Sequence, residues 1–162
     1  MLGVSVQLTT LSYTSDMTTA SGTTPRRALE TLRRAATDGA LDAFCDRHDL
    51  DLFIVFGSTA DPDVAEPRDL DVAVRCDPTS GAQPDVVTIA DELARWLDQD
   101  VIDVVDLARA DVVLRSRALG PRTVPLLEGT RGAFAIAQMA AMAEEMETAP
   151  MRRRDLELLA RH

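Results

Sequence analysis

Two short motifs in the middle of the chain combine residue types that suit chemistry on phosphate groups. The first is the pair Gly57-Ser58, which follows a continuous apolar run at 52–56. The second is Asp69 and Asp71, which begin after ten intervening residues and are separated from each other by one residue. Glycine lets the backbone approach a phosphate closely, and hydroxyl and amide groups can donate hydrogen bonds to it. Two neighbouring carboxylates suit a hard cation such as Mg²⁺, which also takes substrate phosphates as ligands.

The setting of Asp69 and Asp71 distinguishes them from the other aspartates. Asp-x-Asp occurs four times, at 49/51, 61/63, 69/71 and 98/100, so the pattern alone says little. The other three pairs fall at a strand entrance, in a proline-containing loop and in a turn, where solvated aspartate is common. Only Asp69 and Asp71 alternate with apolar residues, which predicts a strand with both carboxylates on one face. Such a pair repels itself unless a bound cation compensates for the charge.

A third acid is expected from the segment 101–107, "VIDVVDL". The segment predicts a strand in which Asp103 and Asp106 lie on opposite faces. Asp103 can therefore come from a neighbouring strand to stand beside the first two acids. A phosphate cradle next to such a group suits metal-assisted nucleotidyl transfer, in which ions neutralise the triphosphate and organise an in-line displacement.

The elements that must position these motifs follow from hydrophobic periodicity and helix-capping signals. We predict helices at 25–36, 41–48, 86–97 and 111–119, strands at 52–56, 70–74 and 101–107, and an edge strand at 124–127 that contains Pro125. The strand at 52–56 is apolar throughout, which is typical of a strand covered on both faces. The predicted fold class is α/β: a small mixed sheet with helices packed mainly on one face and the site at an open edge.

The two ends of the chain differ from this central part. We expect residues 1–24 to form a flexible N-terminal segment without the features of a signal peptide, and Met17 is an alternative start to Met1. The catalytic domain is expected at 25–130, and a helical C-terminal extension at 131–162, broken near Pro150. In that extension Met139, Met142 and Met146 have helical spacing, which predicts packing against the body or against a partner.

Composition narrows the class of protein. The chain is 46% hydrophobic and 27% charged, which is ordinary for a globular protein. Its net charge of −10 argues against direct nucleic-acid binding, although a nucleotide can still bind through a metal ion. No apolar run approaches the ~18 residues of a membrane span, and we expect a cytoplasmic protein with Cys45 and Cys76 reduced and buried. We also expect Trp96 to fill the core and His48 to have a packing role.

At these motifs the sequence resembles a known family. "FGSTA" followed by "DLDVAV" is similar to the minimal nucleotidyltransferase (MNT) group of the DNA polymerase beta-like superfamily, whose signature is Gly-Ser, ten residues, then Asp-x-Asp. Gly57, Ser58, Asp69 and Asp71 match it with the expected spacing. "VIDVVDL" resembles the third-acid strand of the family, and its central position assigns that acid to Asp103. The resemblance covers residues 40–129.

The resemblance implies a function as well as a fold. Small free-standing members of the family are commonly antitoxins that pair with HEPN-domain ribonuclease toxins. They transfer AMP from ATP to a tyrosine of the toxin and so inactivate it. By this resemblance Asp69 and Asp71 would hold Mg²⁺ on the triphosphate, and Asp103 would help to bind a second ion or accept the proton of the attacking hydroxyl. Gly57 and Ser58 would position the departing phosphates.

The sequence departs from the family pattern in two places, and alternatives follow from them. Asp61-Pro62 stands where many relatives have Arg-Gly, so a cation that could hold phosphate is missing there. Arg68 replaces the usual serine before the first metal-binding acid and can restore a charge nearby. One alternative is an antitoxin that masks its toxin by binding, with weak or no catalysis. Another is a nucleotidyltransferase that acts on a small molecule.

Overall fold

The structure is a computed structural model that describes residues 23–159. The expectation of a flexible segment at 1–24 and the alternative start at Met17 fall outside the described residues, apart from 23 and 24. The elements follow the predicted order, with bounds that differ by a few residues: α1 (Pro25–Asp38), α2 (Ala40–Arg47), β1 (Leu50–Phe56), α3 (Gly57–Ala60), β2 (Leu70–Cys76), α4 (Val86–Leu97), β3 (Ile102–Asp106), α5 (Val112–Ala118), β4 (Val124–Glu128) and α6 (Ala133–Leu159).

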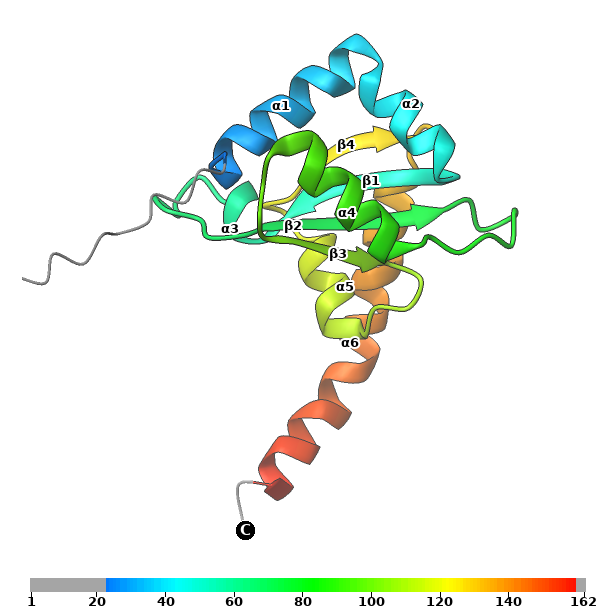
Figure 1. The fold of residues 1–162 in the computed structure, drawn as a ribbon. Helices are drawn as coiled ribbons and strands as arrows, with labels where there is room; N and C mark the ends of the chain where they lie inside the picture. The colour runs from blue at the N-terminus through cyan, green and yellow to red at the C-terminus, as the bar shows by residue number, and fades with distance from the viewer. Residues whose placement is uncertain (1–22, 160–162) are drawn as a thin grey trace, which may run out of the picture.

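The strands form one mixed sheet, which confirms the predicted α/β class. The strand order is β3-β2-β1-β4, with β1 antiparallel to both of its neighbours and β2 parallel to β3 (Figure 1). β4 lies at one edge of the sheet, as Pro125 predicts, since proline cannot donate to a neighbouring strand. In the parallel pair, Asp71 of β2 stands opposite Asp103 of β3. The register therefore places two of the predicted site residues side by side.

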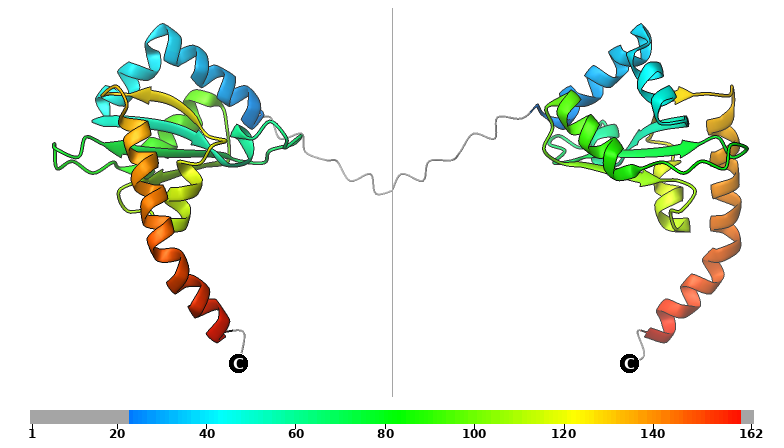
Figure 2. Two further views of the ribbon diagram at one scale, coloured as in Figure 1. Left: turned by 180° about the vertical axis from the view of Figure 1, so that it is seen from behind. Right: turned by 45° about the vertical axis from the view of Figure 1, so that its right-hand side comes forward.

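Alternation along the strands builds two apolar layers. Phe53, Val55 and Val72 face the layer of α1, α2 and α4, while Ile54 and Ala73 face the layer that holds α5 and the first part of α6. The views in Figure 1 and Figure 2 show α1, α2 and α4 on one side of the sheet and α5 and α6 on the other. β1, the central strand, is buried on both faces, as its apolar run predicts.

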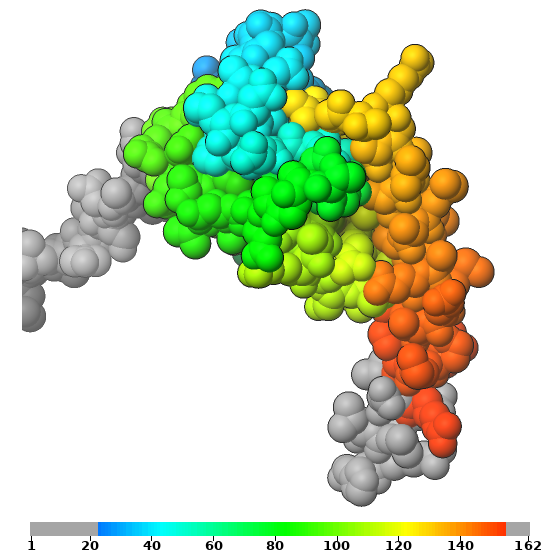
Figure 3. Space-filling view, turned by 90° about the vertical axis from the view of Figure 1, so that its right-hand side faces the viewer, coloured from blue at the N-terminus to red at the C-terminus, as the bar shows by residue number. Residues whose placement is uncertain are grey.

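Helix α6 contradicts the expected break near Pro150. The helix continues from Ala133 to Leu159 with Pro150 inside it. One proline removes a single backbone hydrogen bond, and the surrounding Ala, Met, Glu and Arg residues are strong helix formers, so the helix continues through the proline. Figure 3 shows the first part of the helix along the body of the protein and its C-terminal part extending beyond the body. Met139, Met142 and Met146 are 65%, 59% and 77% exposed, so they do not pack against the body.

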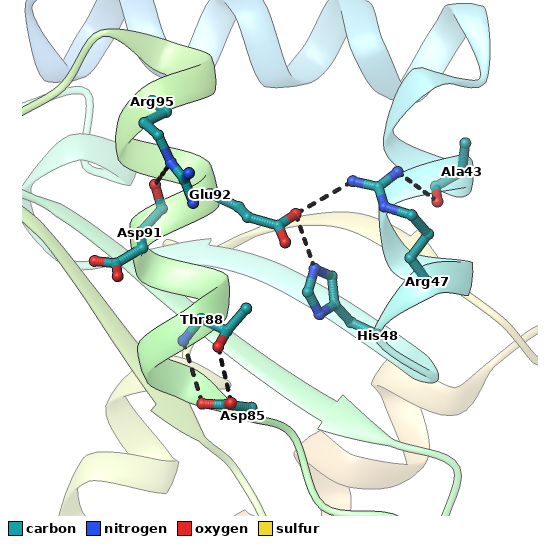
Figure 4. A network of polar contacts seen from close by, with 8 residues as sticks. All are labelled: Ala43, Arg47, His48, Asp85, Thr88, Asp91, Glu92 and Arg95. Atoms are coloured by element: carbon teal, nitrogen blue, oxygen red, sulfur yellow. Dashed lines mark hydrogen bonds and ion pairs between the residues drawn. The ribbon is translucent and has the colours of Figure 1, made fainter.

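Trp96 and His48 lie where α2 meets α4. The prediction that Trp96 fills the core is wrong, because the side chain is 37% exposed and its ring lies 5.6 Å from that of Phe44. The helix turns this position toward solvent, while Leu93 and Leu97 take the buried places. The packing role of His48 is confirmed: its ring lies 4.7 Å from that of Phe44. His48 Nε2 also lies 3.2 Å from a carboxylate oxygen of Glu92 (Figure 4).

Cys45 and Cys76 are free and buried, as the sequence predicts. Burial, with the charges of Asp42 and Asp46, raises the pKa of Cys45 to about 12. Because the thiolate is the reactive form, we expect Cys45 to resist iodoacetamide at pH 8 in the native protein and to react once urea unfolds it. Peptide mass spectrometry measures both states. Rapid labelling of Cys45 in the folded protein would contradict the buried position.

Across residues 23–159, we find no helix with both the length and the apolar character needed to cross a membrane.

Candidate active site

Three carboxylates meet at the end of the sheet where β1 finishes and β2 and β3 begin. Asp69 immediately precedes β2, Asp71 is its second residue, and Asp103 is the second residue of β3. One oxygen atom from each of the three side chains can be chosen so that all lie within 4.8 Å of one another. Asp69 and Asp71 are partly buried, whereas Asp103 is exposed. The structure therefore brings together the three acids that the sequence singled out.

Gly57 makes the turn that joins β1 to this site. Its φ is +70°, a conformation that glycine adopts at little cost. A Cβ atom at this position would overlap the carboxylate of Asp71. Glycine is therefore required twice, once for the backbone angle and once for the space that Asp71 occupies.

Ser58 and Thr59, in the short helix α3, fix the position of Asp69. Ser58 Oγ donates to Asp69 Oδ1 at 3.1 Å, and Thr59 Oγ1 donates to the Asp69 backbone oxygen at 2.6 Å. A hydroxyl has one proton to donate, so in this structure that of Ser58 is directed at the carboxylate. Thr59 is fully buried. Sequence reasoning missed Thr59, because a threonine after a glycine turn carries no signal of its distant partner.

Replacing Thr59 with valine tests the hydrogen bond from Thr59 Oγ1 to the backbone oxygen of Asp69. Valine keeps the shape of threonine but leaves the Asp69 carbonyl without its donor, which we expect to cost about 1–3 kcal/mol of unfolding free energy. We also expect slower catalysis, because Asp69 loses the contact that orients it. Urea denaturation and a transfer assay measure the two effects. A Thr59→Ser variant keeps the hydroxyl and should retain most of the activity, and equal activity of the valine and serine variants would contradict the role.

Two arginines hold the loop between α3 and β2. Arg26 of α1 donates to the backbone oxygens of Thr59, Asp61 and Val64, at 3.2, 2.8 and 2.5 Å. Arg122, which lies before β4, donates from Nη1 to both carboxylate oxygens of Asp61, at 2.8 and 2.7 Å. The same nitrogen lies 2.9 Å from a carboxylate oxygen of Asp63. Neither arginine was singled out from the sequence, since each acts on residues far along the chain.

The remaining Asp-x-Asp pairs lie outside the acidic group, and Asp51 and Asp61 are held by arginines rather than solvated as their settings suggest. Asp51 receives two hydrogen bonds from Arg75, at 3.0 and 2.6 Å. Asp98 ends α4 in a left-handed conformation. The pair 61/63 is held by Arg122. Only Asp69 and Asp71 converge with a third carboxylate, among the residues that the structure describes.

Comparison with known proteins identifies the family of this chain. The family of polymerase beta nucleotidyltransferases matches residues 40–124, which is more than half of the chain. The chain belongs to this family. The matched range contains Gly57, Ser58 and all three carboxylates. A comparison with curated protein sequences finds no match.

Solved structures of toxin–antitoxin complexes share the fold of this nucleotidyltransferase. One is MntA–HpeT with two aspartate-to-glutamate substitutions (TM-score 0.62, 19% identity, covering 76% of this chain and 98% of that one). Another is a toxin–antitoxin complex with AMP-PNP (TM-score 0.60, 20% identity, 83% and 98% covered). A third is a tri-AMPylated Shewanella oneidensis HEPN toxin with MNT antitoxin (TM-score 0.60, 21% identity, 79% and 98% covered).

The electrostatics of the nucleotidyltransferase site centre on Asp71. Burial raises the pKa of Asp71, and the charges of Asp69 and Asp103 raise it further, while the charge of Arg117 lowers it. The net upward direction shows that nearby positive charge does not compensate for the burial and mutual repulsion of these carboxylates. Three carboxylates with oxygen atoms this close match the oxygen ligands that hard divalent cations take. The residues present therefore fit the divalent metal that the family implies.

A pocket of about 440 Å³ opens next to Gly57 and Ser58. Its other walls come from the loop after α3, from the end of α5 and from the segment that joins α5 to β4: Asp61, Val64, Ser116, Arg117, Gly120, Pro121, Arg122 and Thr123. This volume lies in the range of small-ligand sites. A separate pocket of about 590 Å³ between α2 and α4 is lined by Phe44 and Trp96, and neither pocket has any of the three carboxylates in its lining. Only the pocket of about 440 Å³ has Gly57 and Ser58 in its wall, and Ser58 holds Asp69 of the acidic group.

Proposed function

We propose that this nucleotidyltransferase is an antitoxin that transfers AMP from ATP to a tyrosine hydroxyl of a HEPN-type ribonuclease toxin. The observation that carries the proposal is the convergence of Asp69, Asp71 and Asp103 beside Gly57. The likeness in fold to toxin–antitoxin complexes, one with AMP-PNP and one with an AMPylated HEPN toxin, supports the choice of donor and partner. A reaction that uses ATP also fits a cytoplasmic location.

Each site residue would have its own role in this reaction. Asp69 and Asp71 would hold Mg²⁺ at the triphosphate, and Asp103 would help to hold a second Mg²⁺ or accept the proton of the attacking hydroxyl. A bound divalent ion neutralises phosphate charge and lowers the barrier to displacement. The acceptor oxygen forms a bond to the α-phosphorus, the bond from that phosphorus to the β-phosphate bridge breaks, and pyrophosphate leaves. Gly57 leaves room for Asp71, and Ser58 orients Asp69.

A protein acceptor fits the openness of the site. Asp103, which would meet the attacking hydroxyl, is the exposed member of the three acids. Small-molecule sites enclose most of their ligand's surface, so an acceptor that is itself small needs walls around it. Between residues 23 and 159 the structure describes one sheet with its helices and no second domain that would close over Asp103. A tyrosine on the surface of a partner needs no such enclosure.

The proposal is tested by the mass of the partner. The chain is incubated with Mg²⁺, ATP and the protein encoded beside its gene, and the intact mass of that protein is measured. We expect a gain of one or more adenylyl groups on tyrosine, which Asp71→Asn does not produce. A stable complex without any mass gain would favour the binding antitoxin instead. Adenylylation of an added aminoglycoside, with the partner unmodified, would favour the small-molecule enzyme.

A further inference from the structure

The acid at Asp61 occupies a position where many relatives have a phosphate-binding arginine. Two arginines from a later part of the chain line the same pocket as Asp61. Arg117 comes from α5, and Arg122 comes from the loop before β4. Both line the pocket together with Gly57 and Ser58. The positive charge that is absent after the glycine turn is therefore supplied from a later part of the chain.

We propose that Arg117 is the cation that binds the triphosphate of the nucleotide, and that Arg122 is a positioning residue that holds Asp61 and the pocket wall. This assignment rests on the proposed nucleotidyl transfer and extends it to residues outside the family motif. In this assignment the carboxylate of Asp61 holds Arg122 in place by accepting its hydrogen bonds.

Arg117 is free to bind a ligand, unlike the arginines around it. Arg115 donates to the carboxylate of Glu144 and to two backbone oxygens of neighbouring residues, and Arg122 is paired with two aspartates. The Arg117 side chain makes no hydrogen bond or ion pair with any residue of the described part of the chain. An unpaired guanidinium in the wall of the pocket that Gly57 and Ser58 also line is placed to meet an anion.

Ser116 adds a second unused polar group to the same wall. Its hydroxyl oxygen is buried and has no hydrogen-bond partner, and the residue lines the pocket beside Arg117. Buried polar atoms are normally paired, so an unpaired one at a pocket wall is consistent with a partner that arrives with the ligand. The guanidinium of arginine donates two parallel hydrogen bonds to a phosphate, which makes it well suited to this ligand. The two groups together describe a site for an anion with several oxygen acceptors.

Arg122 has a different task, because its charge is already neutralised. Its hydrogen bonds lower the pKa of Asp61 and tie the loop that follows α3 to the loop before β4. Residues of both loops line the pocket. Removing Arg122 should therefore change the shape of the pocket, and an exchanged pair should restore it.

Calorimetric titration of the full chain with Mg²⁺-ATP tests the assignment. We expect Arg117→Ala to weaken binding by about 10- to 100-fold, the range for losing a charge-assisted contact, and Arg117→Lys to recover part of it. Arg95→Ala, on α4 across the sheet, is the matched control and should bind like the wild type. For Arg122, we expect Arg122→Asp to weaken binding and the double variant Asp61→Arg/Arg122→Asp to restore it.

The outcomes separate this inference from the proposed function. Wild-type protein that does not bind Mg²⁺-ATP would overturn both. If the wild type binds Mg²⁺-ATP and the Arg117→Ala and Arg117→Lys variants bind it with the same affinity as the wild type, the assignment of Arg117 alone would be overturned. Failure of the exchanged pair to restore binding, in a variant whose circular dichroism is native, would overturn the positioning role of Arg122.

Discussion

We expect that replacing Asp71 with asparagine abolishes the proposed AMP transfer and at the same time stabilises the protein. Asp71 lies at the centre of the three acids, and losing a ligand that holds the catalytic ion should reduce the rate by at least about 100-fold, because such ions contribute several kcal/mol. Burial and two like charges raise the pKa of Asp71 in the folded protein, so its ionised form lowers stability at neutral pH. Asparagine removes this cost, and we expect the melting temperature to rise by roughly a few degrees.

Transfer assays and thermal unfolding in EDTA at pH 7.5 measure the two effects separately. In EDTA no divalent ion compensates the carboxylates, so the repulsion is at its largest. Asp100→Asn is the matched control, because it belongs to another Asp-x-Asp pair, in the turn before β3, and should change neither quantity. A variant at Asp71 that keeps its activity, or that melts at a lower temperature than the wild type, would contradict the arrangement described here.

Replacing Gly57 with alanine should inactivate and destabilise the protein together. The φ of +70° costs any other residue about 1–2 kcal/mol, and the new methyl group would overlap the Asp71 carboxylate. We expect a total loss of about 2–4 kcal/mol of unfolding free energy, with little remaining transfer activity because Asp71 must move. Urea denaturation and the transfer assay give the two values.

Gly81 provides the control for this substitution. It has nearly the same backbone angle, φ +69°, but a Cβ there would meet no atom within 4 Å. Gly81→Ala should therefore show only the cost of the angle and should keep its activity. The difference between the two variants isolates the collision with Asp71. Equal losses of stability in both, with activity retained in both, would show that Gly57 serves the turn alone.

The parts of this fold that follow from the sequence are those set by local pattern. Alternation around Leu70 and Val72 predicts a strand that directs Asp69 and Asp71 to one side, and the structure has this strand at β2. The choice between Asp103 and Asp106 also follows from alternation, because the two lie on opposite faces and only Asp103 stands opposite Asp71. Hydrophobic alternation and turn-forming residues act over a few positions of the chain, so they can be recognised in the sequence.

The parts that were missed depend on contacts between distant residues. Asp61 and Arg122 are 61 positions apart, and Arg26 reaches the same loop across 33 to 38 positions. The hydrophobic periodicity of the sequence does not indicate which distant residues form such pairs. Trp96 was misplaced because an apolar stripe on a helix does not show which edge of the stripe reaches solvent. Pro150 was read as a break, whereas the helix formers on both sides continue the helix past it.

The pairing of Asp61 also changes how the family departure is interpreted. The absence of arginine at this position was the feature that favoured an antitoxin without catalysis. Arg122 stands directly against Asp61, and Arg117 lies free in the same pocket. Arg122 is neutralised by its aspartate partners, so Arg117 supplies the positive charge at the pocket, and the departure from the family pattern is consistent with an active enzyme.

The fate of the phosphates of ATP tests the central claim most directly. The chain and its partner are incubated with Mg²⁺ and ATP that is radiolabelled at either the α- or the γ-phosphate, and protein-bound label is counted. Nucleotidyl transfer predicts that the partner acquires the α-label and none of the γ-label, and that EDTA or Asp71→Asn prevents this. Label from the γ-phosphate on the partner, or no label from either under conditions where the two proteins form a complex, would contradict the account.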